Sequence, residues 1–160
     1  MRSGITRLAA IVAIGLTQLP SVARAQSDRE QVLATITAFT NALKAKDTVA
    51  MAASLDSVSR MTLLRPTPNG GVRIFLLSGK EFIRQTTQPN QPSYDEPIRN
   101  PIVQIDADLA SVWAEYQVRR DGKVTHCGYD AFQLARLSGR WKIINVSDTF
   151  RQSGCGEPWK

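Results

Sequence analysis

Residues 101–150 decide the fold and read PIVQIDADLASVWAEYQVRRDGKVTHCGYDAFQLARLSGRWKIINVSDTF. Apolar and polar residues alternate along much of this stretch, as they do in strands that bury one face. Asp121-Gly122 is a strong signal for a two-residue hairpin turn, and Ser138-Gly139 is a weaker one. We therefore predict three antiparallel segments, at 101–116 with a break near 106–108, at 123–136 and at 140–150.

Helices are expected before this stretch. Apolar residues recur every third or fourth position over 28–46, which predicts a helix that Ser27 or Asp28 would cap. Asp47 can cap a second, shorter helix, and Ser78-Gly79 can start a third that ends before Pro89. Two strands, around 61–66 and 72–77, are expected between the second and third helices. The prediction is an α+β domain in which a curved antiparallel sheet wraps around three helices from the N-terminal half of the chain.

The N-terminal residues 1–25 have the order of a cleavable signal peptide. Arg2 and Arg7 precede an apolar stretch, and the small-residue triplet at 23–25 follows it. The apolar stretch is shorter than the roughly 20 residues of a membrane-spanning helix. We expect a single mature domain at 26–160, periplasmic or secreted, with no membrane attachment after cleavage.

Charge and cysteine content narrow the expected partners. Loss of the leader removes three arginines and lowers the formal charge from +6 to +3, and the remaining basic residues are scattered. Nucleic acid is therefore not an expected partner. Cys127 and Cys155 are the two cysteines, and in an exported domain we predict that they form a disulfide. With one histidine and no paired ligand spacing, we expect neither a metal nor another cofactor.

Three short motifs carry a resemblance to a known superfamily. They are Phe39-x-x-Ala42 followed by Lys46-Asp47, then Asp108-Leu109-Ala110-x-Val112-Trp113, and finally Gly139-Arg140-Trp141-Lys142-Ile143. In this order they resemble the nuclear-transport-factor-2-like superfamily, and in particular small exported relatives of its polyketide-cyclase-like and ketosteroid-isomerase-like branches. The resemblance covers the mature chain and implies a cone-shaped sheet with an open mouth. It implies no particular reaction.

Two-residue hairpin loops would fix which residues share a face of the sheet. On that assumption Gln117 lies opposite His126, and Trp113 lies opposite Asp130. The resulting face, called the graded face below, is polar near His126 and apolar near Leu109. The other face of the sheet is more uniformly apolar. Five residues of the graded face are candidate ligand-binding residues: Trp113, Glu115, His126, Asp130 and Arg151.

Two interpretations of the graded face lead to different functions. If it is concave, its polar groups line the mouth of the cone and can orient a ligand. If it is the outer side of the sheet, its charges are solvated or paired with one another. The second interpretation is favoured, because charged residues on one side of an antiparallel sheet need no further reason.

The leading functional hypothesis is a domain that binds a small apolar ligand. The first alternative is a proton-transfer enzyme of ketosteroid-isomerase or dehydratase type, with His126 or Asp130 as the base and a tyrosine such as Tyr116 as the hydrogen-bond donor. The second alternative is an interaction module whose open sheet face forms a homodimer.

Overall fold

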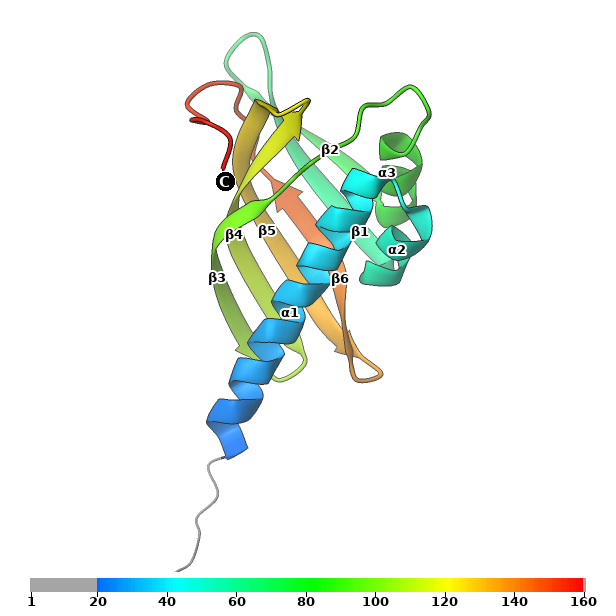
Figure 1. The fold of residues 1–160 in the computed structure, drawn as a ribbon, viewed down its shortest axis with the longest axis vertical. Helices are drawn as coiled ribbons and strands as arrows, with labels where there is room; N and C mark the ends of the chain where they lie inside the picture. Colours follow the sequence, from blue (N-terminus) through cyan, green and yellow to red (C-terminus); the bar gives the residue numbers. More distant parts are fainter. Residues whose placement is uncertain (1–19, 160) are drawn as a thin grey trace, which may run out of the picture.

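The structure, a computed structural model, describes residues 20–159 (Figure 1). Most of the predicted signal peptide, residues 1–19, lies outside the described residues. Among the helices of the described part, none is long and apolar enough to cross a membrane.

Three helices precede or interrupt the sheet, as predicted. They are α1 (Pro20–Ala45), α2 (Thr48–Ser54) and α3 (Gly79–Thr86). Helix α1 begins earlier than predicted, at Pro20, a residue whose fixed φ suits a first helical turn. The proposed caps Ser27 and Asp28 therefore lie inside the helix, and the Asp28 carboxylate pairs instead with Arg136, at 2.6 Å.

The caps of the two shorter helices follow from local sequence. Asp47 accepts hydrogen bonds from the backbone N–H groups of Val49 and Ala50. Ser78 and Glu81 form a reciprocal capping box at the start of α3. These side chains satisfy backbone donors that the first helical turn leaves free.

A single curved sheet of six strands carries the rest of the fold. The strands are β1 (Leu55–Pro66), β2 (Val72–Ser78), β3 (Ile98–Asp106), β4 (Leu109–Arg120), β5 (Lys123–Leu137) and β6 (Arg140–Asp148). Their order is β2-β1-β6-β5-β4-β3, and only β1 and β6 pair in parallel. Helix α1 lies across the concave face, with α2 and α3 beside β1 and β2 (Figure 1). The predicted α+β class with a curved sheet around helices is confirmed.

The register predicted from two-residue loops is wrong over most of β4 and β5. Asp130 lies opposite Ala114 instead of Trp113, and His126 lies opposite Val118 instead of Gln117. The shift arises between Val118 and Arg119, where Thr125 is an extra residue in β5. A one-residue slip turns every side chain to the other face of its strand, so the bulge redistributes the residues of both predicted faces.

The hydrophobic core lies between α1 and the concave face. Val32, Ile36 and Leu43 on α1 are completely or almost completely buried. They belong to the same buried cluster as Val112 and Phe132 of the sheet. The helical spacing of three and four and the alternation of the strands thus meet in one core.

The C-terminal tail is fastened to the sheet by a disulfide and by a buried amide. Cys127 and Cys155 are bonded, with their Cα atoms 5.5 Å apart, as predicted. The fully buried Gln117 donates hydrogen bonds to the carbonyl oxygens of Cys155 and Glu157 and accepts one from the Trp159 N–H. The tail is therefore held at several points along its length.

Reduction of the disulfide should destabilise the domain. The bond closes a loop of 28 residues, for which loop-closure entropy corresponds to about 2–4 kcal/mol. Urea unfolding should show this loss for Cys155→Ala, and for the native chain in the presence of reductant. Ser153→Ala, an exposed change in the same tail, is the matched control and should leave the midpoint unchanged. An equal midpoint with and without reductant would contradict the prediction.

Candidate functional site

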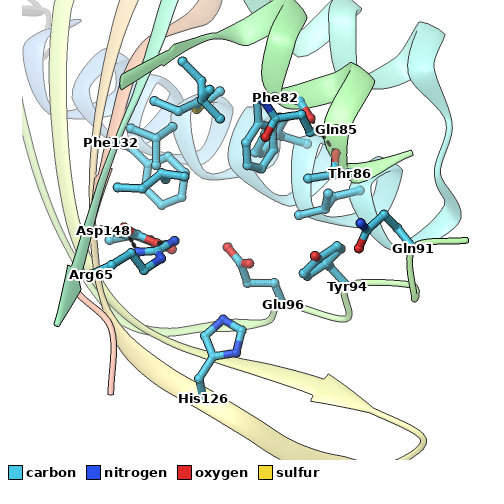
Figure 2. A pocket seen from close by; sticks show the side chains of 17 residues that line it. Arg65, Phe82, Gln85, Thr86, Gln91, Tyr94, Glu96, His126, Phe132 and Asp148 are labelled. Atoms are coloured by element: carbon cyan, nitrogen blue, oxygen red, sulfur yellow. Dashed lines mark hydrogen bonds and ion pairs between the residues drawn. The ribbon is translucent and has the colours of Figure 1, made fainter. Parts of the chain in front are cut away.

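A cavity of about 230 Å³ lies between the concave face of the sheet, α1, α3 and the loop that precedes β3 (Figure 2). The sheet side of the cavity receives residues from β1, β2, β5 and β6. Gln85 and Gln91 line it and are also exposed, so the cavity meets solvent beside these two residues. Its volume is a little below the usual range for ligand pockets and corresponds to about eight water molecules.

One part of the cavity wall is apolar. Its residues come from α1, the sheet and α3: Phe39, Leu43, Met61, Leu63, Leu77, Phe82, Phe132 and Val146. Several of them belong to the main core, so the cavity is a gap in the packing of the domain's own interior. Such a wall favours a ligand with an apolar body, because transfer of apolar surface out of water is favourable.

A partly buried ion pair anchors the polar end. The Arg65 guanidinium binds both oxygens of Asp148, with N–O distances of 2.6 and 2.8 Å. The Leu64 N–H also donates to Asp148, at 3.2 Å. The partner of Asp148 thus comes from β1, although Lys142 and Arg151 are closer in sequence. The bidentate geometry commits the guanidinium to this carboxylate, and its Nη1 also donates to the Leu64 carbonyl oxygen at 2.9 Å.

Two further carboxyl groups share this end of the cavity. Asp130 is 2% exposed, and its Oδ2 has no hydrogen-bond partner among the described residues. Burial, and then the negative charges of Glu96 and Asp148, raise the pKa of Asp130 well above its usual range. Burial, reinforced by the charge of Asp148, likewise raises the pKa of Glu96 to about 8. Figure 2 shows the Glu96 side chain pointing into the cavity, above His126 and beside Arg65.

His126 and Tyr116 differ in their access to the cavity. His126 lines it, and burial together with the charges of Arg65 and Arg120 lowers the pKa of the imidazole to about 4. The imidazole is therefore neutral at physiological pH. Tyr116 is 2% exposed, and its hydroxyl donates to the carbonyl oxygen of Thr149 at 2.7 Å. Burial raises the pKa of Tyr116, so this hydroxyl keeps its proton.

The other three candidate ligand-binding residues lie on the opposite face of the sheet. Trp113 is 46% exposed and stacks on Tyr129 outside the cone. Glu115 pairs with Arg99 at 2.6 Å. Arg151 is exposed, and together with Glu115 it lines a separate depression of about 140 Å³ beside the tail. The structure thus separates these three residues from His126 and Asp130: the bulge at Thr125 displaces Trp113 and Glu115, and a second register shift between β5 and β6, at Gln133, places Arg151 opposite Cys127.

Two residues of the polar end were missed by sequence analysis. Arg65 comes just before a proline at the end of β1, and Glu96 lies in a proline-rich connecting loop. Neither position has a local pattern that indicates burial. The one available signal is Asp148, an acidic residue that follows the alternating strand residues 140–147 and that needs a partner if it is buried.

The arrangement can bind or move a proton but shows no preformed metal centre. No group of three or more His, Cys, Asp or Glu side chains is placed to hold a metal ion within residues 20–159. Protonated carboxyl groups can donate a hydrogen bond, and after ionisation they can accept several. Both states are accessible to Glu96 near neutral pH.

Comparison with known proteins identifies the fold. No family model matches the chain, and no curated protein matches it. Among solved structures, an NTF2-like protein with a cystatin-like fold from Novosphingobium aromaticivorans is 12% identical, with a TM-score of 0.67 over 88% of this chain and 94% of that one. The chain has the nuclear-transport-factor-2-like fold. The resemblance seen in the three sequence motifs is thereby confirmed at the level of fold.

Two further solved structures share this fold; one is a protein of unknown function and the other is an association domain. A protein of unknown function from Mycobacterium tuberculosis is 12% identical, with a TM-score of 0.69 over 83% of this chain and 77% of that one. The association domain of C. elegans CaMKII is 21% identical, with a TM-score of 0.59 over 78% of this chain and 96% of that one. At these identities the similarity concerns the fold, and the site must be judged from its own residues.

The buried carboxyl groups should make the domain less stable as the pH rises above neutrality. Glu96 holds a proton in the folded state up to about pH 8, whereas in the unfolded chain its pKa returns to near 4.5. The folded state therefore binds more protons in this interval, and the free energy of unfolding should fall by about 2 kcal/mol between pH 6.5 and 8.5 through Glu96. His126 acts in the opposite direction, mainly between its folded pKa of about 4 and the unfolded value of 6.5, so it offsets only a small part of this loss above pH 6.5.

Urea unfolding at pH 6.5 and pH 8.5 measures this effect. Glu96→Gln should reduce the loss of stability with pH, since an amide does not titrate. Asp106→Asn, at an exposed position at the end of β3, is the control and should retain it. Equal or greater stability of the native chain at pH 8.5 would contradict the prediction.

Proposed function

We propose that this protein is an exported domain that binds a small, mostly apolar molecule in the cavity of its cone. The main support for this proposal is the cavity, which has an apolar wall and a polar end. At the polar end the Oδ2 atom of Asp130 is buried without a hydrogen-bond partner among the described residues. Buried polar groups nearly always have partners, so an unpartnered one in a cavity points to a missing ligand group. The small volume favours a ligand with one ring or a short chain.

Export is supported by the N-terminal sequence and by the disulfide. The order of charged, apolar and small residues in 1–25 is typical of a signal peptide. The bond between Cys127 and Cys155 is of the kind that persists in oxidising compartments. We propose that the mature chain begins near Gln26 and works in the periplasm or outside the cell, and the intact mass of the exported protein tests this start.

Filling the cavity should abolish ligand binding. Leu63→Trp on β1 replaces an aliphatic side chain of the apolar wall with a larger indole ring. We expect at least about a tenfold loss of affinity for 2-phenylethanol and 2-phenylethylamine, two probes of suitable size, because the substituted ring occupies their space. Saturation-transfer NMR and calorimetry measure binding, and native mass spectrometry of the purified protein reports any retained molecule.

A matched control is available on the same strand. Val58 is 72% exposed, so Val58→Trp adds a similar ring outside the cavity and should leave binding unchanged. Equal loss of binding in both variants, or unaltered binding in both, would contradict a ligand site in this cavity.

Proton transfer is the second candidate function, favoured by the raised pKa of Glu96. A carboxyl group whose pKa is about 8 can both accept and donate protons near neutral pH, as general acid–base catalysis requires. Asp130 and His126 line the same cavity, while the Tyr116 hydroxyl is already engaged by Thr149. Exchange of the acidic C–H hydrogens of phenylacetone in D₂O, present with the native chain and lost in Glu96→Gln, would reveal this chemistry. Equal exchange in both would exclude Glu96 as the base.

Self-association through the outer face of the sheet is a third candidate. Ile102 and Trp113, which pair across β3 and β4, are 62% and 46% exposed. Exposed apolar patches of this kind mark interaction surfaces. The fold is shared with an association domain, which makes assembly through the same architecture a reasonable proposal.

Charged residues on the outer face should disrupt such a dimer. We expect the native chain to sediment as a dimer and the double variant Ile102→Glu, Trp113→Glu as a monomer, because buried like charges oppose association. Val49→Glu, at a 77% exposed position on α2, is the control and should leave the sedimentation coefficient unchanged. A native chain that is monomeric at micromolar concentrations would exclude this candidate.

A further inference from the structure

The polar end of the cavity contains more acidic groups than positive charges. Three carboxyl groups line it, from Glu96, Asp130 and Asp148. Arg65 is the one lysine or arginine among the lining residues in the described part of the chain. Since its guanidinium binds both oxygens of Asp148, the other two carboxyl groups have no cation of their own.

Hydrogen bonds within the described residues do not engage the same two groups. The Oδ2 atom of Asp130 is buried and has no partner within residues 20–159, and no hydrogen bond or ion pair to Glu96 is present in that part of the chain. Asp130 lies directly opposite Asp148 across β5 and β6, which places two acidic side chains side by side. A group that enters here meets several carboxyl oxygens and one guanidinium that is already neutralised.

Aromatic rings complete the surroundings. Tyr94, His126, Phe82 and Phe132 line the cavity. In Figure 2, Tyr94 lies beside the Glu96 side chain and His126 lies below it, while Phe82 and Phe132 lie toward the apolar wall. The face of an aromatic ring carries partial negative charge and attracts cations. The Arg120 guanidinium already lies over the Tyr94 ring, 5.1 Å from its centroid, so the carboxyl groups and the other rings favour a cationic ligand.

We propose that the ligand of this cavity is a small organic cation, a protonated primary amine on an apolar body, whose ammonium group binds between the carboxyl groups of Glu96 and Asp130. This inference rests on the proposed ligand-binding function and specifies its ligand class. An ammonium group has three hydrogen-bond donors and one positive charge, which match two carboxylates that lack partners. The apolar body would occupy the wall formed by Phe82, Phe132 and their neighbours.

Binding of a cation should release protons from the protein. The charged and titratable groups around the site are Arg65, Tyr94, Glu96, Tyr116, Arg120, His126, Asp130 and Asp148. Among them, Glu96 and Asp130 are the carboxyl groups without a bound cation, and an ammonium group favours their ionised forms. Affinity should therefore rise with pH through the titration of Glu96, as long as the amine, whose pKa is about 10, stays protonated.

Three matched probes test the ligand class by calorimetry on the mature chain. They are 2-phenylethylamine, 2-phenylethanol and phenylacetate, which share one ring and differ in charge. At pH 7.5 the amine should bind at least about tenfold more tightly than the alcohol, and phenylacetate should bind most weakly. The amine's affinity should increase at least roughly tenfold from pH 6 to pH 8, and its heat of binding should differ between phosphate and Tris buffers because protons are released.

Two variants link the selectivity to the named carboxyl groups. Glu96→Gln and Asp130→Asn should each reduce amine affinity by about tenfold or more while changing alcohol affinity little. Asp106→Asn, at an exposed site outside the cavity, is the control and should behave as the native chain does. Proton release on amine binding is measured with the native chain alone. The inference therefore stays testable if a variant fails to fold.

The outcomes separate this inference from the function on which it rests. Binding of the alcohol as tightly as the amine, with no proton release, would overturn the cation and leave a ligand-binding cavity. Tightest binding of phenylacetate would also overturn it and would make Arg65 the anchor. If none of the three probes binds, and Leu63→Trp matches the native chain, the proposed binding function fails and the inference fails with it.

Discussion

The extra residue at Thr125 is the constraint on which the rest of this site depends. Val118 pairs with His126 and Arg119 pairs with Val124, so Thr125 has no opposite residue. Beyond this bulge the even-numbered side chains of β5 face the helices, and His126 and Asp130 enter the cavity. Without it, the same strand would turn these side chains toward solvent.

Burial of acidic groups next to one another gives the cavity its chemical character. Each carboxyl group loses hydration; in addition the charge of Asp148 raises the pKa of Glu96, and the charges of Glu96 and Asp148 raise the pKa of Asp130, because like charges repel. Arg65 compensates one of them, Glu96 with a pKa of about 8 keeps its proton at neutral pH, and the pKa of Asp130 is raised in the same direction. The same imbalance lowers stability at high pH and favours a cationic ligand, so stability and binding have one physical origin.

The site could be predicted from sequence only in part. His126 and Asp130 were recognised as candidates and do line the cavity, but they were grouped with Trp113, Glu115 and Arg151, which lie on the outer face. The grouping assumed that β4 and β5 pair without a register shift. A single sequence has no reliable pattern that predicts a bulge. Arg65 and Glu96 could not be found, because their burial depends on β1 and the loop before β3 meeting β5 and β6 in space.

The sequence by itself determined the elements and their chemistry. Periodicities of 3.6 and 2 indicate the helices and strands, Asp47 and Ser78 start two of the helices, and glycine turns separate the last three strands. The two cysteines of an expected exported chain predicted the disulfide. Only the tertiary structure decided which face of each strand lines the cone, and which charges are buried there. Those outcomes depend on register and on contacts between segments distant in sequence, whereas helix caps and turns depend on neighbours along the chain.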